Sequence, residues 1–169
     1  MTIRPVLDAL LATLQRVDPS HASQLVDGLD RDQIASRLAS LPVRFASEVH
    51  EYFAWRNGLS ADREVELELF PEAVMLSLDE ALADYRMLCD IAEGISKQAG
   101  IPAAAVWDAR WLPLFRHPAG GAYHVTLGDE APKERAPILS ILQEDVSGAF
   151  IAFESLEDLI WKANEALRR

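Results

Sequence analysis

The sequence predicts an α+β fold: a single domain with a mostly antiparallel sheet packed by helices, and extra helices at the N-terminus. Short apolar or alternating runs at 111–115 and 122–127 flank the Pro/Gly break HPAGG, which indicates a hairpin. The runs at 137–142 and 149–153 repeat the pattern around a turn expected at 143–148. A sheet with this many apolar residues needs helices over one face, and we expect the first 110 residues to supply these helices.

The N-terminal part is predicted to be helical. An apolar stripe at helical spacing indicates a helix over 4–16, and Pro5 suits its first turn. A short helical turn over 20–28 would then stop at Gly28. We therefore predict an N-terminal helical extension over 1–29 and a main α+β domain over 30–169.

Two further helices are predicted to follow. Asp30 and Gln33 have the spacing of a capping box in front of an apolar stripe. Leu41-Pro42 is expected to begin the next helix, with Asn57-Gly58 at its C-terminal stop, where a left-handed residue is favoured. An apolar stripe on a helix is usually the face that meets the core, although a pair of partner-docking helices is the functional alternative.

A strand and a long helix are expected in the middle of the chain. Over 61–73, apolar residues alternate with glutamates, which is the period of a half-buried strand with carboxylates on its wet face. Ser77 and Glu80 form a second capping-box pattern before a helical stripe. The segment 94–109 contains two glycines and a proline and is expected to be a loop.

The chain ends in an amphipathic helix that Ser155 is expected to open. Trp107, Trp111 and Trp161 are aromatic anchors by residue type. For Trp111 and Trp161, strand and helix spacing makes a core role at least as plausible.

Composition bounds the class of protein. Half of the residues are apolar and a quarter charged, which is typical of a soluble globular protein. No apolar run is long enough to span a bilayer and the N-terminus lacks a cleavage pattern, so we expect a cytoplasmic protein that contacts no membrane. The single cysteine, Cys89, fits a reducing compartment, and it is expected to be buried and inert.

The formal net charge is −11, and the acid is concentrated in residues 61–110, with eleven acidic and four basic side chains. This balance disfavours direct binding to nucleic acid, which depends on clustered Lys and Arg. It favours a basic partner. The alternative is that the charge serves solubility alone.

No catalytic or metal-binding pattern is found. The histidines His21, His50, His117 and His124 are scattered, without metal-ligand spacing. A site shared by His117 and His124 is geometrically possible, and a small hydrolase at the hairpin is the corresponding hypothesis. Because no nucleophile or carboxylate motif accompanies them, we predict a protein without catalysis, cofactor or bound metal.

The order of the elements resembles the SUKH superfamily, which includes yeast cell-wall regulators and many bacterial immunity proteins. The features that match, over roughly residues 30–167, are Leu41-Pro42, Asn57-Gly58, the segment FPEAVMLSLDEALADY, Trp111 with Pro113, the hairpin, and FESLEDLI before the last helix. The resemblance implies an α+β binding module without catalysis. In the bacterial branches it implies neutralisation of a toxin, often a nuclease, by direct binding.

Two functions follow as expectations. The first is an immunity protein that binds a basic toxin domain, because a surface studded with carboxylates can occupy a site built to attract phosphate. Its candidate contact residues are Glu64, Glu66, Glu68 and Glu72, continued by Asp79 and Asp84. The second is a regulatory or scaffold protein of the same superfamily. The simpler alternative for these glutamates is that they lie on a solvent-exposed edge strand and contact no partner.

Overall fold

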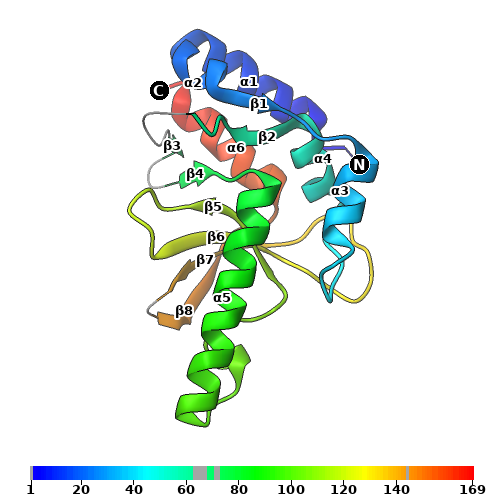
Figure 1. Ribbon diagram of the computed structural model, residues 1–169. Coiled ribbons are helices and arrows are strands. Elements are labelled where there is room, and N and C mark those ends of the chain that lie inside the picture. Colours follow the sequence, from blue (N-terminus) through cyan, green and yellow to red (C-terminus); the bar gives the residue numbers. More distant parts are fainter. Residues whose placement is uncertain (1, 63–67, 71–72, 144) are drawn as a thin grey trace.

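A computed structural model describes the chain except for residues 1, 63–67, 71–72 and 144 (Figure 1). The helices are α1 (Arg4–Val17), α2 (Pro19–Gln24), α3 (Arg31–Leu38), α4 (Ser47–Trp55), α5 (Leu78–Ala99), the 3-10 helix η1 (Ala103–Ala105) and α6 (Leu156–Leu167). The strands are β1 (Leu25–Asp27), β2 (Arg56–Leu59), β3 (Glu68–Phe70), β4 (Ala73–Met75), β5 (Trp111–Arg116), β6 (Ala122–Leu127), β7 (Ile138–Leu142) and β8 (Asp145–Phe153).

The fold is α+β, as predicted. The larger sheet has the order β3-β4-β5-β6-β7-β8, and each neighbouring pair is antiparallel. β1 and β2 form a separate antiparallel ribbon. Figure 1 shows α5 crossing one face of the sheet, while α1 and α6 lie together at the β3 end of the molecule. Among the described residues, no helix combines the length and apolar character needed to cross a membrane.

The buried side chains form two clusters, one toward each face of the sheet. The larger cluster joins α1, α4 and α6 to β4 and β5, and it includes Leu7, Leu10 and Leu14 of the first helix. The smaller cluster lies under the C-terminal half of α5 and contains Trp107 and Trp111. Because α1 contributes three fully buried leucines, the N-terminal helix packs as part of the same core as the sheet.

A buried carboxylate connects the helices of the larger cluster. Glu48 of α4 is 1% exposed, and its oxygens accept hydrogen bonds from the backbone N–H groups of Ala136 (2.9 Å), Leu156 (3.2 Å) and Glu157 (3.3 Å). Leu156 and Glu157 are the first residues of α6, whose unpaired amides attract negative charge. Burial raises the pKa of Glu48, and the three amides and nearby Arg135 oppose that rise.

Several local predictions are confirmed. α1 carries Pro5 in its first turn, and both capping boxes form, Asp30 with Gln33 before α3 and Ser77 with Glu80 before α5. The hairpin of β5 and β6 lies where the Pro/Gly break indicates it. Ser155 caps α6 by accepting from the backbone N–H of Asp158 (3.1 Å).

The predicted helix start at Leu41-Pro42 is wrong, because α4 begins at Ser47. The segment before it pairs with a distant loop instead: Arg44 and Asp129 exchange two backbone hydrogen bonds, of 2.8 and 2.9 Å. The first amides of α4, those of Ser47 and Glu48, donate to carbonyls of the same loop. A tertiary contact therefore outweighs the local helix signal.

The predicted helix stop at Asn57-Gly58 is also wrong, because these residues lie inside β2. The Asn57 side chain accepts a hydrogen bond from the backbone N–H of Leu78 (2.8 Å), the first residue of α5. Gly58 has φ +71°, and a Cβ there would lie 2.3 Å from the backbone nitrogen of Ser77. The pair is required for the close approach of β2 to the start of α5.

Three other boundaries differ from the predictions. α5 runs through Gly94 to Ala99 and ends at Gly100, with φ +68°, so only the later part of the 94–109 segment is a loop. The turn expected at 143–148 is shorter, because β8 already begins at Asp145. The 20–28 segment ends as a strand, which pairs with β2. Of the strand expected over 61–73, β3 covers Glu68–Phe70, and 63–67 and 71–72 lie outside the described residues.

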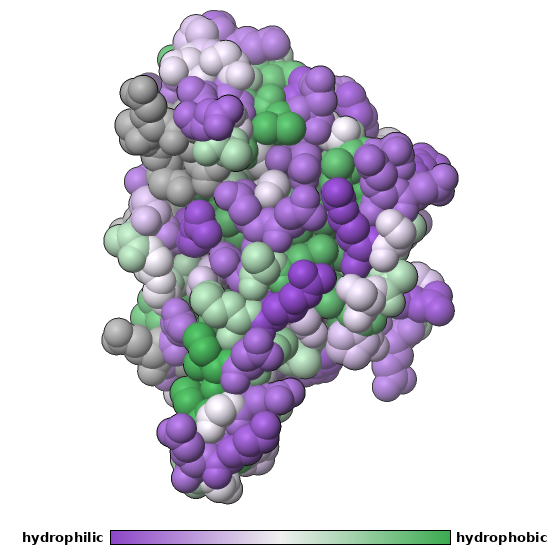
Figure 2. All heavy atoms as spheres, viewed as in Figure 1, coloured by the Kyte–Doolittle hydropathy of each residue, from purple (hydrophilic) through white to green (hydrophobic). Residues whose placement is uncertain are grey.

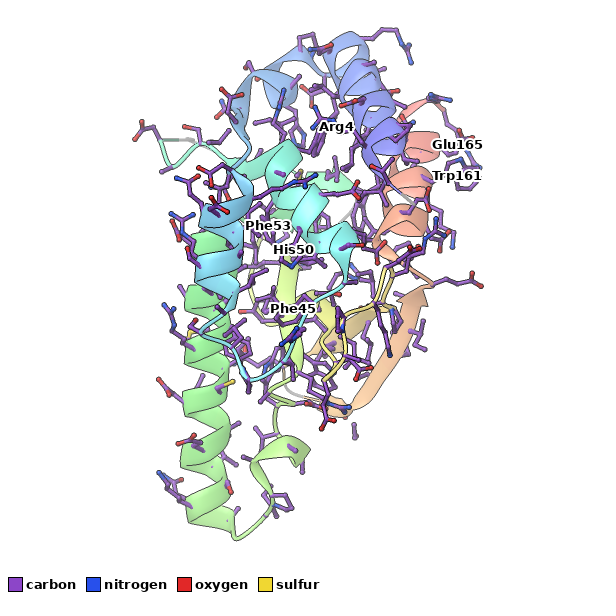
Figure 3. The ribbon with its side chains drawn as sticks, turned by 90° about the vertical axis from the view of Figure 1, so that its right-hand side faces the viewer. Arg4, Phe45, His50, Phe53, Trp161 and Glu165 are labelled. Atoms are coloured by element: carbon purple, nitrogen blue, oxygen red, sulfur yellow. The ribbon has the colours of Figure 1, made fainter. Side chains whose placement is uncertain are left out.

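We predict that Glu48→Gln lowers the free energy of unfolding by about 2 kcal/mol or more, because its NH₂ group would face backbone donors and leave buried amides unpaired. Urea denaturation followed by circular dichroism measures the change. Glu165→Gln is the matched control, since Glu165 lies on the outer side of α6 (Figure 3) and, among the described residues, its carboxylate pairs with exposed Arg168 (3.4 Å). A loss at Glu48 no larger than at Glu165 would contradict the role of this carboxylate.

Candidate functional site

The predicted acidic patch is only partly described. Glu64, Glu66 and Glu72 lie outside the described residues. Glu68 is exposed on β3, and Asp79 is exposed in the first turn of α5, 3.5 Å from Arg37.

Asp84, the last residue of the predicted patch, lies deeper than the others. Its side chain is 14% exposed and forms an ion pair with Arg116 (3.5 Å). Burial raises the pKa of Asp84, and the Arg116 guanidinium opposes that rise. Glu68 is in register with Arg116 through Val74, so Glu68 and Asp84 belong to the same neighbourhood. The charge of Asp84 is therefore largely engaged within the fold.

The histidines occupy separate environments. His21 is buried in α2, and His50 is half-buried on α4. In the hairpin turn, Nδ1 of His117 accepts from the backbone N–H of Ala119 (3.0 Å). The ring of His124 contacts those of Phe70 (5.5 Å) and Phe153 (6.0 Å), which also contact each other (6.2 Å). Within the described part of the chain, no three His, Cys, Asp or Glu side chains converge on a possible metal position.

The cysteine and the tryptophans differ in their exposure. Cys89 is a half-buried free thiol whose pKa is raised by burial. Trp107 and Trp111 are buried and in edge-to-face contact (5.3 Å). Trp161, in contrast, lies on the outer side of α6 with more than half of its surface exposed (Figure 3).

Among the described residues, the most exposed large apolar side chains lie on the last hairpin of the sheet. Leu142 of β7 is 60% exposed, and Phe150 and Ile151 of β8 are 60% and 64% exposed. Phe150 and Ile151 are consecutive in a strand, so their side chains point to opposite faces of the sheet. We call Leu142, Phe150 and Ile151 the β8 edge surface. At Phe150 and Ile151 neither face of the sheet is covered.

Two rows of residues paired across the sheet show that side-chain burial decreases from β5 toward β8. One row runs from buried Phe115 through His124 and Ser140, both half-buried, to exposed Phe150. The second row, on the other face, leads from buried Pro113 and Val125 through half-buried Leu139 to exposed Ile151. Both faces therefore change from covered to open between β5 and β8.

A second apolar surface lies beside α5. A groove of about 350 Å³ is lined by Leu88, Ile91 and Ile95 of α5, by Val106 and Trp107, and by Gly121 and Gln143 at strand ends. Figure 2 shows apolar side chains gathered along the lower half of α5. Trp107 is 3% exposed, and its indole N–H has no hydrogen-bond partner among the described residues.

A further cleft, lined by charged and apolar side chains, lies on another side of the molecule. It has a volume of about 720 Å³ and lies between the start of α1, α3 and α4 (Figure 3). Arg4, Arg31 and His50 line it together with Asp32 and Glu51. Two of these side chains are engaged, because Arg4 pairs with Asp8 (3.0 Å) and Glu51 accepts from the backbone N–H of Ile3 (2.9 Å). Because positively and negatively charged side chains both line the cleft, it favours neither an anionic nor a cationic ligand.

The comparisons with known proteins give no family. No protein-family model matches the chain, and a search of curated proteins finds no significant match. The resemblance to the SUKH superfamily therefore depends on the sequence motifs alone.

Sequence reasoning missed the β8 edge surface. The run AFIAF is apolar at nearly every position, a pattern typical of a strand buried on both faces. The signal that could have indicated exposure is the preceding DVSG, which is polar and belongs to the same strand. A strand half polar and half apolar fits an edge better than a centre.

We predict that Ile151→Thr and Phe150→Thr each change the free energy of unfolding by less than about 0.5 kcal/mol, because both side chains are exposed and Thr suits a strand. Val125→Thr is the buried counterpart in the Ile151 row and should cost about 1–2 kcal/mol. Urea denaturation of the three variants measures the difference. A loss at Ile151 as large as at Val125 would mean that Ile151 is buried in solution.

Mild acid should destabilise the fold through His21, which is buried, and His50, which is half-buried. Burial lowers the pKa of His21, against the opposing charge of Asp18, and also lowers the pKa of His50. The unfolded chain, with histidine pKa values of about 6.5, then binds protons more readily than the folded chain. Stability should therefore be full above about pH 6.5 and fall as the pH drops toward the lower folded values.

The free energy of unfolding at pH 7.5 and 5.5 measures this loss, and His21→Phe, which cannot titrate, should reduce it. Glu165→Gln serves as a control that leaves the loss unchanged. An equal loss with and without the imidazole of His21 would contradict the assignment.

Proposed function

We propose that the chain is a non-catalytic protein-binding module, and specifically an immunity protein that binds and neutralises a cognate toxin domain. The observation that carries the proposal is the β8 edge surface, because large apolar side chains on an open sheet edge are typical of protein interaction sites. The net charge of −11 favours a basic partner, as a nuclease toxin would be. The motifs shared with the SUKH superfamily support the immunity role.

The test begins with the DNA that flanks the gene. An immunity gene should lie directly beside a large secreted toxin gene, whereas the gene of a scaffold protein need not. Co-expression of the C-terminal domain of that toxin with this chain should restore growth, and the two proteins should co-purify. If the toxin kills cells that express folded chain, and no complex forms, the immunity proposal is wrong and the scaffold alternative is favoured.

Two groups of variants locate the contact surface. Ile151→Lys should weaken toxin binding at least about tenfold, since it places a strongly hydrated charge in the proposed contact. Met87→Lys is the matched control, because Met87 is an exposed apolar residue on α5, away from the β8 edge surface. Reversal of Glu64, Glu66 and Glu68 to Lys tests the acidic patch, and it should weaken binding and reduce its dependence on salt. If only the reversal has an effect, the partner binds at the β3 side of the molecule.

A further inference from the structure

β8 is the longest strand of the sheet among the described residues and has a free side. Among the described residues it pairs only with β7, and its nine residues, Asp145–Phe153, include no Lys, Arg or Pro. Those residues are common devices that keep a sheet edge from pairing with other chains. The opposite edge, β3, covers only Glu68–Phe70 within the described part of the chain. Within the described residues β8 is the longer edge, and its pairing with β7 shifts register at two places.

The two ends of β8 carry negative charge. Asp145 begins the strand, and its carboxylate accepts from the Ser147 hydroxyl (2.6 Å) and the backbone N–H of Gly148 (3.2 Å). Glu154 follows the last residue of the strand and is exposed. Neither carboxylate has an ion-pair partner among the described residues. The nearest cation of α6, Lys162, lies over the ring of Phe153 but is paired with Asp158 (2.8 Å).

These charges distinguish between possible occupants of the edge. If two copies paired antiparallel through β8, Asp145 of each copy would lie near Glu154 of the other, and this repulsion would occur at both ends. An extended segment with Lys or Arg at its ends would instead be attracted at both ends. The exposed side chains of Phe150 and Ile151 would contact its alternate side chains on the two faces.

We infer that β8 accepts an extended, basic segment of a partner protein as a seventh strand, and that Asp145 and Glu154 prevent two copies of this chain from pairing through the same edge. The inference rests on the proposed role as a protein-binding module. It adds the mode of docking, which is strand addition, and the chemistry of the partner segment.

A synthetic peptide tests the docking mode without the partner. The probe is a peptide of alternating Val and Thr with two lysines at each end, and its matched control carries glutamates in place of the lysines. On addition to the isotope-labelled chain, the lysine peptide should shift the NMR amide signals of β8. We expect it to bind at least about tenfold more tightly than the glutamate peptide at low salt.

The variants test the charges and the edge separately. Asp145→Asn with Glu154→Gln should remove the preference for lysine, while the side-chain carbonyl that the first substitution introduces still accepts from Ser147 and Gly148. Ile151→Lys should abolish binding of the lysine peptide, and Met87→Lys should leave it unchanged. Equal binding of the two peptides, or shifts that map to the α5 groove, would overturn the inference.

Sedimentation velocity tests the exclusion of a second copy. The unaltered chain should stay monomeric at low salt, and the Asp145→Asn, Glu154→Gln variant should form dimers as its concentration rises. Adding Ile151→Lys to that variant should restore the monomer. If the double variant stays monomeric at every concentration, the two carboxylates do not prevent pairing of two copies through β8.

The two proposals can fail independently. Rescue from the toxin, together with an absence of peptide binding at β8, would overturn strand addition and leave the immunity function standing. Peptide binding at β8 without any rescue would overturn the immunity function alone.

Discussion

The Glu48 carboxylate holds together three segments that are far apart in the sequence. Its hydrogen bonds reach the amide of Ala136 in the loop before β7 and the first two amides of α6. Burial of a charge is costly, and here backbone donors and the positive end of a helix replace the lost water. A substitution that removed the carboxylate would leave those amides buried without an acceptor. The Glu48 side chain of α4 therefore fixes the start of α6, while the buried apolar face of α6 holds the rest of the helix against the core.

The position of α6 decides which part of the sheet is covered. α1, α4 and α6 pack together and bury β4 and β5, and α5 covers the opposite face near β5 and β6. α6 reaches the C-terminal end of β8, where Phe153 packs against the larger cluster, but Phe150 on one face and Ile151 on the other are exposed. The open edge is thus a consequence of where the helices are anchored. The partner binding that we propose would use this edge without disturbing the packed core.

Prediction from the sequence succeeded where the determinants are local. Capping boxes, the Pro/Gly hairpin break and the apolar stripes of α1 and α5 act within a few residues, so their patterns appear in the sequence. It failed where distant segments decide, as at Leu41-Pro42, which lies in a segment that pairs with the loop around Asp129. The β8 edge surface was missed for the same reason, because its exposure depends on distant segments. An apolar strand shows that it prefers burial, but only the strand order shows whether anything covers it.

Some of the described acidic side chains form ion pairs within the fold, and others are free to act on a partner. Asp84 and Asp79 of the predicted patch are paired with Arg116 and Arg37, so these two carboxylates contribute within the fold as well as to its field. A net charge of −11 still attracts a basic partner from a distance, which raises the rate of encounter whatever surface is finally used. To fix the register of a partner strand against β8, charges must lie next to the contact itself. Asp145 and Glu154 meet that need, because they lie at the two ends of an open strand and are unpaired by any described cation.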